Sequence, residues 1–189
     1  IKYKDQNGDL FVNSSDYTVI GRGLPKHIGG FTNNFTYKGF DLNVFFQWSY
    51  GNDILNANRI MFDGNSVNNN YLNQFASYQN RWSPDNPTSD IFRTKGYYGG
   101  GYSSQYVEDG SFLRLKTVSL GYNFDSNWVK KMNIKSIRLY MSAQNIATWT
   151  KYSGPDPEVN VYNSALTSGF DFSAYPIAQT ITFGTNIIF

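Results

Sequence analysis

Oxygen-bearing side chains alternate near the start of the 189-residue chain, at Asp5, Asn7 and Asp9, and Asp16 follows them. Hard cations such as Ca²⁺ bind several carboxylate and amide oxygens at alternating positions, so this spacing suits a calcium loop. Leu10 stands where such a loop needs its turn glycine, and the last ligand is Asp16 rather than a glutamate. Asx-rich runs also form turns without any metal. Calcium bound at these four side chains (the Asp5 loop) and a metal-free turn are both open.

Aromatic side chains form a second candidate binding set, because Phe, Trp and Tyr make up 18% of the residues while charged residues make up only 16%. Exposed aromatic rings can stack on sugars or pack against a partner protein. Large loops also need small cores of their own, and packing of the loops is the favoured explanation. The candidate ligand-contact residues are Arg81, Trp82, Tyr97, Tyr98, Tyr102 and Tyr152.

The composition argues against most catalytic chemistry. No cysteine is present, which excludes disulfides and thiolate sites, and a single histidine, His27, leaves no material for a histidine-based metal cluster or triad. Acidic residues such as Asp109 and Asp171 can be paired as acid and base only arbitrarily. The net charge of +2 gives no support for nucleic-acid binding. We expect a non-enzyme with no catalytic residues and no cofactor beyond the possible calcium.

The elements that carry these residues are predicted to be strands. Along 40–50, residues with even numbers are apolar, from Phe40 to Tyr50, and those with odd numbers are polar except Phe45. A strand places successive side chains on opposite faces, so one face is apolar and the other polar. The same alternation predicts further strands. The expected strands are 27–37, 40–50, 112–124, 136–149 and 177–189.

One strand is out of phase with itself. Within 112–124, Val118 and Leu120 share a face with Tyr122, but Leu113 and Leu115 fall on the opposite one. Either a bulge near Lys116 switches the phase, or this end of the strand stands above a membrane, where a cation costs little. The second explanation is preferred.

Short and long connections alternate between these strands. Lys38-Gly39 forms a tight hairpin and 125–135 a short link, whereas 1–26, 51–110 and 151–175 are long. Such alternation is typical of an outer-membrane β-barrel, with short periplasmic turns and long extracellular loops. Within 51–110, the aromatic residues Tyr71, Phe75, Tyr78 and Trp82 recur at helical spacing and predict a short amphipathic helix.

The chain is expected to be a piece of a longer one, because about eight strands are the fewest that close a membrane barrel. The alternative is a soluble extracellular β-sandwich that binds carbohydrate through surface aromatics. A sandwich also alternates, but its two apolar faces pack on each other.

In an ordered series of runs, the sequence resembles the C-terminal barrel portion of SusC/RagA-type TonB-dependent outer-membrane transporters. The matching runs are Asp5–Asp9, Val19–Lys26, Gly29–Phe31, Tyr37–Leu42, Tyr50–Asp53, Arg81–Pro87, Val107–Lys116, Leu120–Tyr122, Ala143–Asn145, Thr150–Gly154, Asp156–Glu158 and Tyr175–Pro176. The resemblance implies an all-β fold, namely the last five strands of a 22-stranded barrel, and an N-terminal plug that lies outside this chain.

The resemblance also implies function and partners. It implies an outer-membrane importer of glycans or peptides in a Gram-negative bacterium, energised through TonB and working with a SusD-like surface lipoprotein. The partners implied are the rest of the transporter, the lipoprotein, TonB, outer-membrane lipid and the glycan or peptide substrate.

The final residues have the pattern polar-x-Gly-x-x-apolar-x-aromatic, at Thr182, Gly184, Ile187 and Phe189. This pattern resembles the signal that the assembly machinery reads in outer-membrane barrels. The alternative is an ordinary amphipathic strand.

Overall fold

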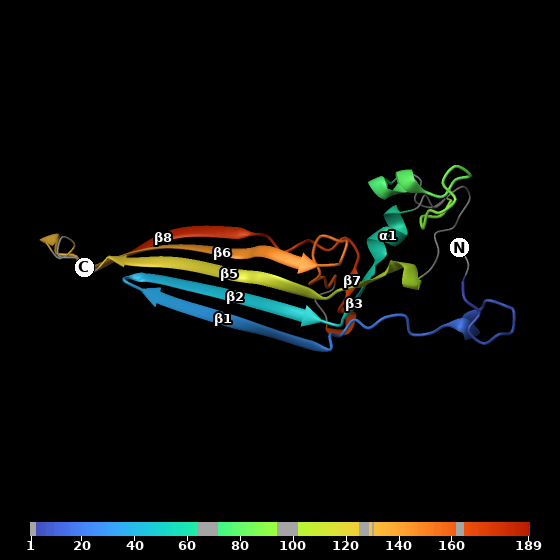
Figure 1. Ribbon diagram of the computed structural model, residues 1–189, viewed down its shortest axis with the longest axis horizontal. Helices are drawn as coiled ribbons and strands as arrows, with labels where there is room; N and C mark the ends of the chain where they lie inside the picture. Colours follow the sequence, from blue (N-terminus) through green and yellow to red (C-terminus); the bar gives the residue numbers. More distant parts are fainter. Residues whose placement is uncertain (1–2, 64–71, 94–101, 125–128, 130, 162–164) are drawn as a thin grey trace. The chain divides into compact units, whose positions relative to one another are not determined.

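The computed structural model describes residues 3–63, 72–93, 102–124, 129, 131–161 and 165–189 (Figure 1). The chain divides into two compact units. The sheet unit comprises Pro25–Asn52, Asp109–Glu158 and Tyr175–Phe189, and the loop unit comprises Ile1–Leu24, Asp53–Glu108 and Val159–Ala174. Among the described residues, no helix combines the length and apolar character that crossing a membrane requires.

Five antiparallel strands form the sheet unit, in the order β1-β2-β5-β6-β8 (Figure 1). They are β1 (His27–Tyr37), β2 (Phe40–Tyr50), β5 (Phe112–Phe124), β6 (Ser136–Thr150) and β8 (Thr180–Ile188). The bounds of β1, β2 and β5 are those expected from the alternation, and β6 extends one residue past Trp149. The hairpin between β1 and β2 has positive φ at both Lys38 (45°) and Gly39 (87°), as a type I′ turn requires.

The strand β8 begins at Thr180, later than the expected start at Ile177. Over residues 177–179, hydrogen bonds that involve side chains replace the backbone pairing between strands. The carbonyl of Ala178 accepts a hydrogen bond from Asn145 Nδ2, and Gln179 Nε2 donates to the carbonyl of Ile146. The segment therefore follows β6 without pairing to it as a strand.

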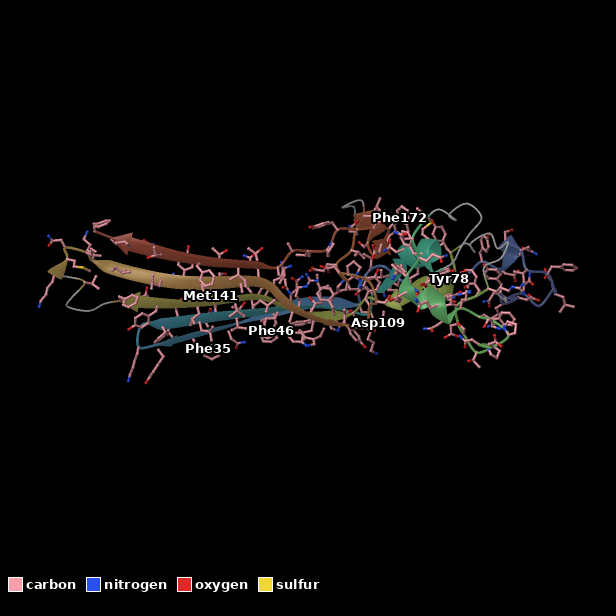
Figure 2. All side chains as sticks on the ribbon, turned by 90° about the horizontal axis from the view of Figure 1, so that it is seen from above. Phe35, Phe46, Tyr78, Asp109, Met141 and Phe172 are labelled. Carbon is pink, nitrogen blue, oxygen red and sulfur yellow. The ribbon has the colours of Figure 1, made fainter. Side chains whose placement is uncertain are left out.

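Pairing across the sheet gathers the apolar side chains on one face, which we call the apolar face. Phe31 pairs with Phe46, Leu42 with Leu120, and Met141 with Phe183. Figure 2 labels Phe35, Phe46 and Met141, three members of this face. Many of its members are exposed, including Tyr37 (68%) and Phe183 (74%). The opposite, polar face carries side chains such as Asn43, Gln47 and Ser119 on the alternate positions.

The phase change in β5 arises from a bulge. The preferred explanation, that this end of the strand stands above a membrane, is therefore wrong as the cause of the phase change. Thr117 pairs with Phe45, but Leu115 pairs with the very next residue, Phe46, so Lys116 is the extra residue. Because one inserted residue reverses the alternation, Leu113 and Leu115 join Val118 on the apolar face. The pairing with β6 is irregular at the same place, between Leu115 and Thr117.

The loop unit holds a small sheet in the order β4-β3-β7 and several short helices. Its elements are η1 (Ser14–Asp16), β3 (Asp53–Asn56), α1 (Ala57–Phe62), η2 (Ala76–Asn80), η3 (Ser104–Tyr106), β4 (Val107–Asp109, whose last residue belongs to the sheet unit), η4 (Ala165–Thr167) and β7 (Phe170–Asp171). The amphipathic helix expected from Tyr71 to Trp82 is wrong as predicted: Phe75 caps the 3₁₀ helix η2, and Tyr71 lies outside the described residues. Ile54 and Tyr106 are fully buried in this unit.

Candidate functional site

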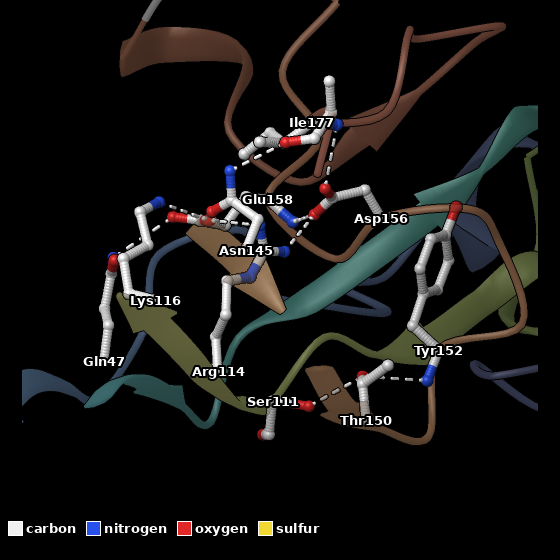
Figure 3. A network of polar contacts seen from close by, with 11 residues as sticks. Gln47, Ser111, Arg114, Lys116, Asn145, Thr150, Tyr152, Asp156, Glu158 and Ile177 are labelled. Carbon is white, nitrogen blue, oxygen red and sulfur yellow. Dashed lines mark hydrogen bonds and ion pairs between the residues drawn. The ribbon is translucent and has the colours of Figure 1, made fainter. Parts of the chain in front are cut away.

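The polar face of the sheet carries a buried ionic network around Arg114 (Figure 3). The Arg114 side chain is only 2% exposed. Its Nη2 lies 2.6 Å from Asp156 Oδ1, and its Nη1 lies 3.1 Å from Glu158 Oε2. Asp156 and Glu158 both belong to the segment that follows β6, so a guanidinium of β5 binds this segment through two carboxylates. Charge-assisted contacts of this length are among the strong hydrogen bonds in proteins.

The Asp156 carboxylate joins three stretches of chain. Besides Arg114, its Oδ1 accepts a hydrogen bond from the backbone N–H of Glu158 at 2.9 Å, and its Oδ2 accepts one from the N–H of Ile177 at 3.1 Å. The strand β5, the segment after β6 and the segment before β8 thus meet at a single side chain (Figure 3).

The network extends outward through Glu158. Lys116 Nζ lies 3.5 Å from Glu158 Oε2, and Gln47 Nε2 donates to Glu158 Oε1 at 3.1 Å. Lys116 and Glu158 are 30% and 24% exposed, so this pair is more open to water than the Arg114–Asp156 pair. The bulge at Lys116 allows Arg114 and Lys116 to lie on the polar face while their neighbours Leu113 and Leu115 lie on the apolar face.

A second charged pair stands nearer the β1–β2 hairpin on the polar face. Arg138 Nη2 contacts Asp41 Oδ2, and Asn123 Nδ2 donates to Asp41 Oδ1 at 3.3 Å. Asn43 Nδ2 donates to Asn34 Oδ1 on the same face. The polar face is therefore a hydrogen-bonded wall, and the Arg114 network is its most buried part.

The loop unit has its own polar core, which centres on Arg59 of α1. Its Nε lies 2.7 Å from Asp63 Oδ2 and its Nη1 lies 3.2 Å from Glu108 Oε1, which also accepts from Asn56 Nδ2. Burial lowers the pKa of Arg59, but the hydrogen bonds and charges of Asp63 and Glu108 outweigh burial and raise it overall. Sequence reasoning missed Arg59, although Asp63 stands four residues after it, at the spacing of a helical ion pair. Its other carboxylate partner, Glu108, is 49 positions away, and no local pattern couples the two.

The described candidate ligand-contact residues are divided between the two units. The Arg81 guanidinium lies 4.8 Å from the centre of the Tyr78 ring, the backbone N–H of Trp82 donates to the carbonyl of Ile91, and Tyr102 is 70% exposed. Tyr152 belongs to the sheet unit and is 5% exposed. Tyr97 and Tyr98 lie outside the described residues.

The ring of Tyr152 lies over Gly154, where an added Cβ would come within about 2.5 Å of it. Its backbone N–H donates to Thr150 Oγ1 at 3.1 Å (Figure 3). Both contacts are within its own segment, and a role of Tyr152 in ligand contact stays a prediction.

In the Asp5 loop, the carboxylates accept backbone hydrogen bonds. Asp5 accepts from the N–H groups of Gly8 and Leu10, and Asp16 accepts from those of Gln6 and Asn13. The hydrogen bonds from Asn13 and Gln6 lower the pKa of Asp16.

Asn7 and Asp9 bond to each other and to the local backbone in the same loop. Among the described residues, no group of three or more His, Cys, Asp or Glu side chains is arranged to hold a metal ion. The calcium expectation at Asp5, Asn7, Asp9 and Asp16 stays a prediction.

The pattern at Thr182, Gly184, Ile187 and Phe189 falls on and just after β8. Ile187 is on the apolar face, paired with Ile137, whereas Thr182 and Gly184 are on the polar face, paired with Ser142 and Tyr140. Its role as an assembly signal stays a prediction.

Comparison with known proteins finds relatives that are TonB-dependent receptors. No family model matches it. It is 36% identical over 99% of its length to TonB-dependent receptor P3 of Formosa agariphila, of which it covers 19%, and 31% identical over 99% to TonB-dependent receptor SusC of Bacteroides thetaiotaomicron, of which it covers 17%. The chain thus spans about a fifth of the length of these curated relatives.

The fold gives the same result. A solved structure of the RagAB peptide importer in an open-open state superposes with a TM-score of 0.75 and 28% identity, covering 87% of this chain and 17% of that one. A second structure, of the RagAB peptide transporter, superposes with a TM-score of 0.70 and 27% identity, covering 85% of this chain. By sequence and by fold, the chain corresponds to a segment of a SusC/RagA-type TonB-dependent receptor.

Proposed function

We propose that the chain forms part of the wall of an outer-membrane β-barrel, with its apolar face toward lipid and its polar face toward the lumen. The observation that carries this proposal is the exposure of large apolar side chains along one face of the five-stranded sheet. Phe183 is 74% exposed and Leu120 is 41% exposed, although both lie well inside their strands. In water such a face is unfavourable, whereas in a bilayer it is the surface that lipid covers.

The two edges of the sheet support the same proposal. Both β1 and β8 pair with one neighbour only among the described strands. Unpaired backbone groups are not tolerated in hydrocarbon, so further strands must complete the barrel on both sides. We propose that these five strands are the last of the barrel, with 1–26, 51–110 and 151–175 on the extracellular side.

The complete receptor, we propose, is an active importer of glycans or peptides that draws energy through TonB and works with a SusD-like surface lipoprotein. Support comes from the names of the relatives, which are TonB-dependent receptors, and from the similar structures, which are those of a peptide importer. Within such a receptor, this chain contributes a wall and a loop anchored on it by the Arg114 network.

The β-sandwich alternative lacks its second layer. Two apolar faces would have to pack on each other. In the described part of the sheet unit there is one sheet, and its apolar face is exposed.

Two neighbouring residues of β5 give a matched test of the membrane orientation. Leu120 is on the apolar face and 41% exposed, while Ser119 is on the polar face, paired with Asn43. An arginine facing mid-bilayer costs ~2–4 kcal/mol. In the full receptor, Leu120→Arg should sharply reduce the folded receptor in the outer membrane, whereas Ser119→Arg should leave most of it in place. Equal effects of the two variants on the amount of folded receptor would refute the orientation.

A further inference from the structure

A tyrosine ring occupies the space above the glycine in the middle of β8. Tyr140 of β6 and Gly184 of β8 are direct partners in the strand register, on the polar face. A Cβ added at Gly184 would lie 2.3 Å from Tyr140 Cζ and 2.4 Å from its hydroxyl oxygen. Real Cβ atoms do not approach ring atoms so closely, so Tyr140 in its present position requires a glycine opposite it.

The same arrangement occurs at the other edge of the sheet. On the apolar face, the Trp48 indole lies over Gly29 of β1, with an added Cβ only 2.3 Å from Trp48 Cζ2. On the polar face, the Phe45 ring lies over the adjacent Gly30, at 2.8 Å from an added Cβ. Each edge strand of the sheet thus has a glycine covered by an aromatic ring of its single described neighbour.

A glycine inside a strand normally weakens it, because it has no side chain to pack and loses more backbone entropy on folding. An aromatic ring laid over the glycine restores packing in the gap. It also makes the pair selective, because other residues at that position carry a Cβ that the ring excludes.

We propose that Tyr140 is a positioning residue that locks the register of β8 on β6, and that Gly184 is needed because it accommodates the Tyr140 ring. This inference rests on the proposed barrel wall. A one-residue slip of β8 would turn its apolar side chains to the polar face. A two-residue slip keeps the faces but sets Thr182 or Asn186 opposite Tyr140, and both carry a Cβ.

The proposal gives Gly184 a role different from that of a recognition signal. If the assembly machinery reads the glycine, alanine at 184 should be harmful whatever residue stands at 140. If the Tyr140 ring requires the glycine, removal of the ring should relieve the harm. The two roles are separated by a double variant.

The experiment compares the full receptor with Gly184→Ala, Tyr140→Ala, the double variant Tyr140→Ala/Gly184→Ala, and Tyr140→Phe, in outer-membrane fractions. Heat-modifiable migration on electrophoresis measures the folded barrel. Overpacking by Gly184→Ala should lower the folded yield roughly tenfold. Tyr140→Phe keeps the ring and should match the unaltered receptor, and the double variant should recover to the yield of Tyr140→Ala alone. A Gly184→Ala receptor with normal yield, or a double variant no better than Gly184→Ala, would overturn the proposal.

Cysteine pairs read the register directly, and this chain has no cysteine of its own. Ser142→Cys with Thr182→Cys probes the register of the structure, in which these residues are partners. Ser142→Cys with Thr180→Cys probes the two-residue slip. Adding Tyr140→Ala should increase the slipped cross-link relative to the first. An unchanged ratio would count against a register lock, whereas a receptor that assembles in register but imports nothing would contradict only the proposed function.

Discussion

Removal of the Asp156 carboxylate should release the segment that follows β6 from the wall of the sheet. Asp156→Ala breaks a contact of 2.6 Å to Arg114, whose side chain is 2% exposed, and also removes the acceptor for the N–H groups of Glu158 and Ile177. Loss of one partner from a buried ion pair typically costs about 3–5 kcal/mol. Arg114 keeps its contact with Glu158, so the lower end of this range, about 3 kcal/mol, is expected here. Since 1.4 kcal/mol is a factor of ten in an equilibrium constant, a loss of about 3 kcal/mol should make local opening roughly 100-fold more frequent.

Hydrogen–deuterium exchange with mass spectrometry, on the full receptor in detergent, measures this opening. Faster exchange is expected in peptides that cover 152–158 and 175–179, while those from β1 and β2 should not change. Lys116→Met is the matched control, because its contact with Glu158 is longer, at 3.5 Å, and both side chains are partly exposed. An exposed pair contributes within about 1 kcal/mol, so the control should show little effect. Unchanged exchange in Asp156→Ala, or an equal effect of Lys116→Met, would refute the reasoning.

Two further predictions concern the Asp5 loop. Because its carboxylates already accept backbone N–H groups, we expect the loop to keep its fold without calcium, so that a chelator leaves the protease cleavage pattern over residues 3–20 unchanged; new cleavage on chelation would instead establish a calcium loop. The lowered pKa of Asp16 predicts that its stabilisation is complete above the usual carboxyl pKa of 3.8 and is lost as the pH falls through the lower, folded-state pKa. Pepsin cleavage near residues 10–20 should accordingly rise as the pH falls below about 4, and Asp16→Asn should weaken this dependence.

The period-two alternation was sufficient to predict the five strands of the sheet unit, apart from the later start of β8, but not the short strands β3, β4 and β7. Within β2 the pattern from Phe40 to Tyr50 fits only a strand, because alternate residues of a strand lie on the same face. The bulge at Lys116 could not be distinguished in the same way. A phase change in a single strand has several causes, and only the pairing of Leu115 with Phe46 shows that one residue is inserted.

The Arg114 network could not be predicted from the sequence, for a different reason. Arg114 and Asp156 are 42 positions apart, and no local pattern couples them. One signal was available, since two cations on the polar side of a strand call for counter-charges and the closely spaced Asp156 and Glu158 could supply them. The covered glycines were also invisible, because the ring that covers Gly184 comes from another strand.

The Arg114 network also determines the local electrostatic potential of the wall. Arg114 and Lys116 are cationic side chains of β5, and the carboxylates of Asp156 and Glu158 balance them only while their segment stays on the sheet. Withdrawal of that segment would present two neighbouring cations without counter-ions, and their field would attract anions over about one Debye length, ~8 Å at physiological salt. A movement of a few residues would thus change the net charge of this part of the polar face.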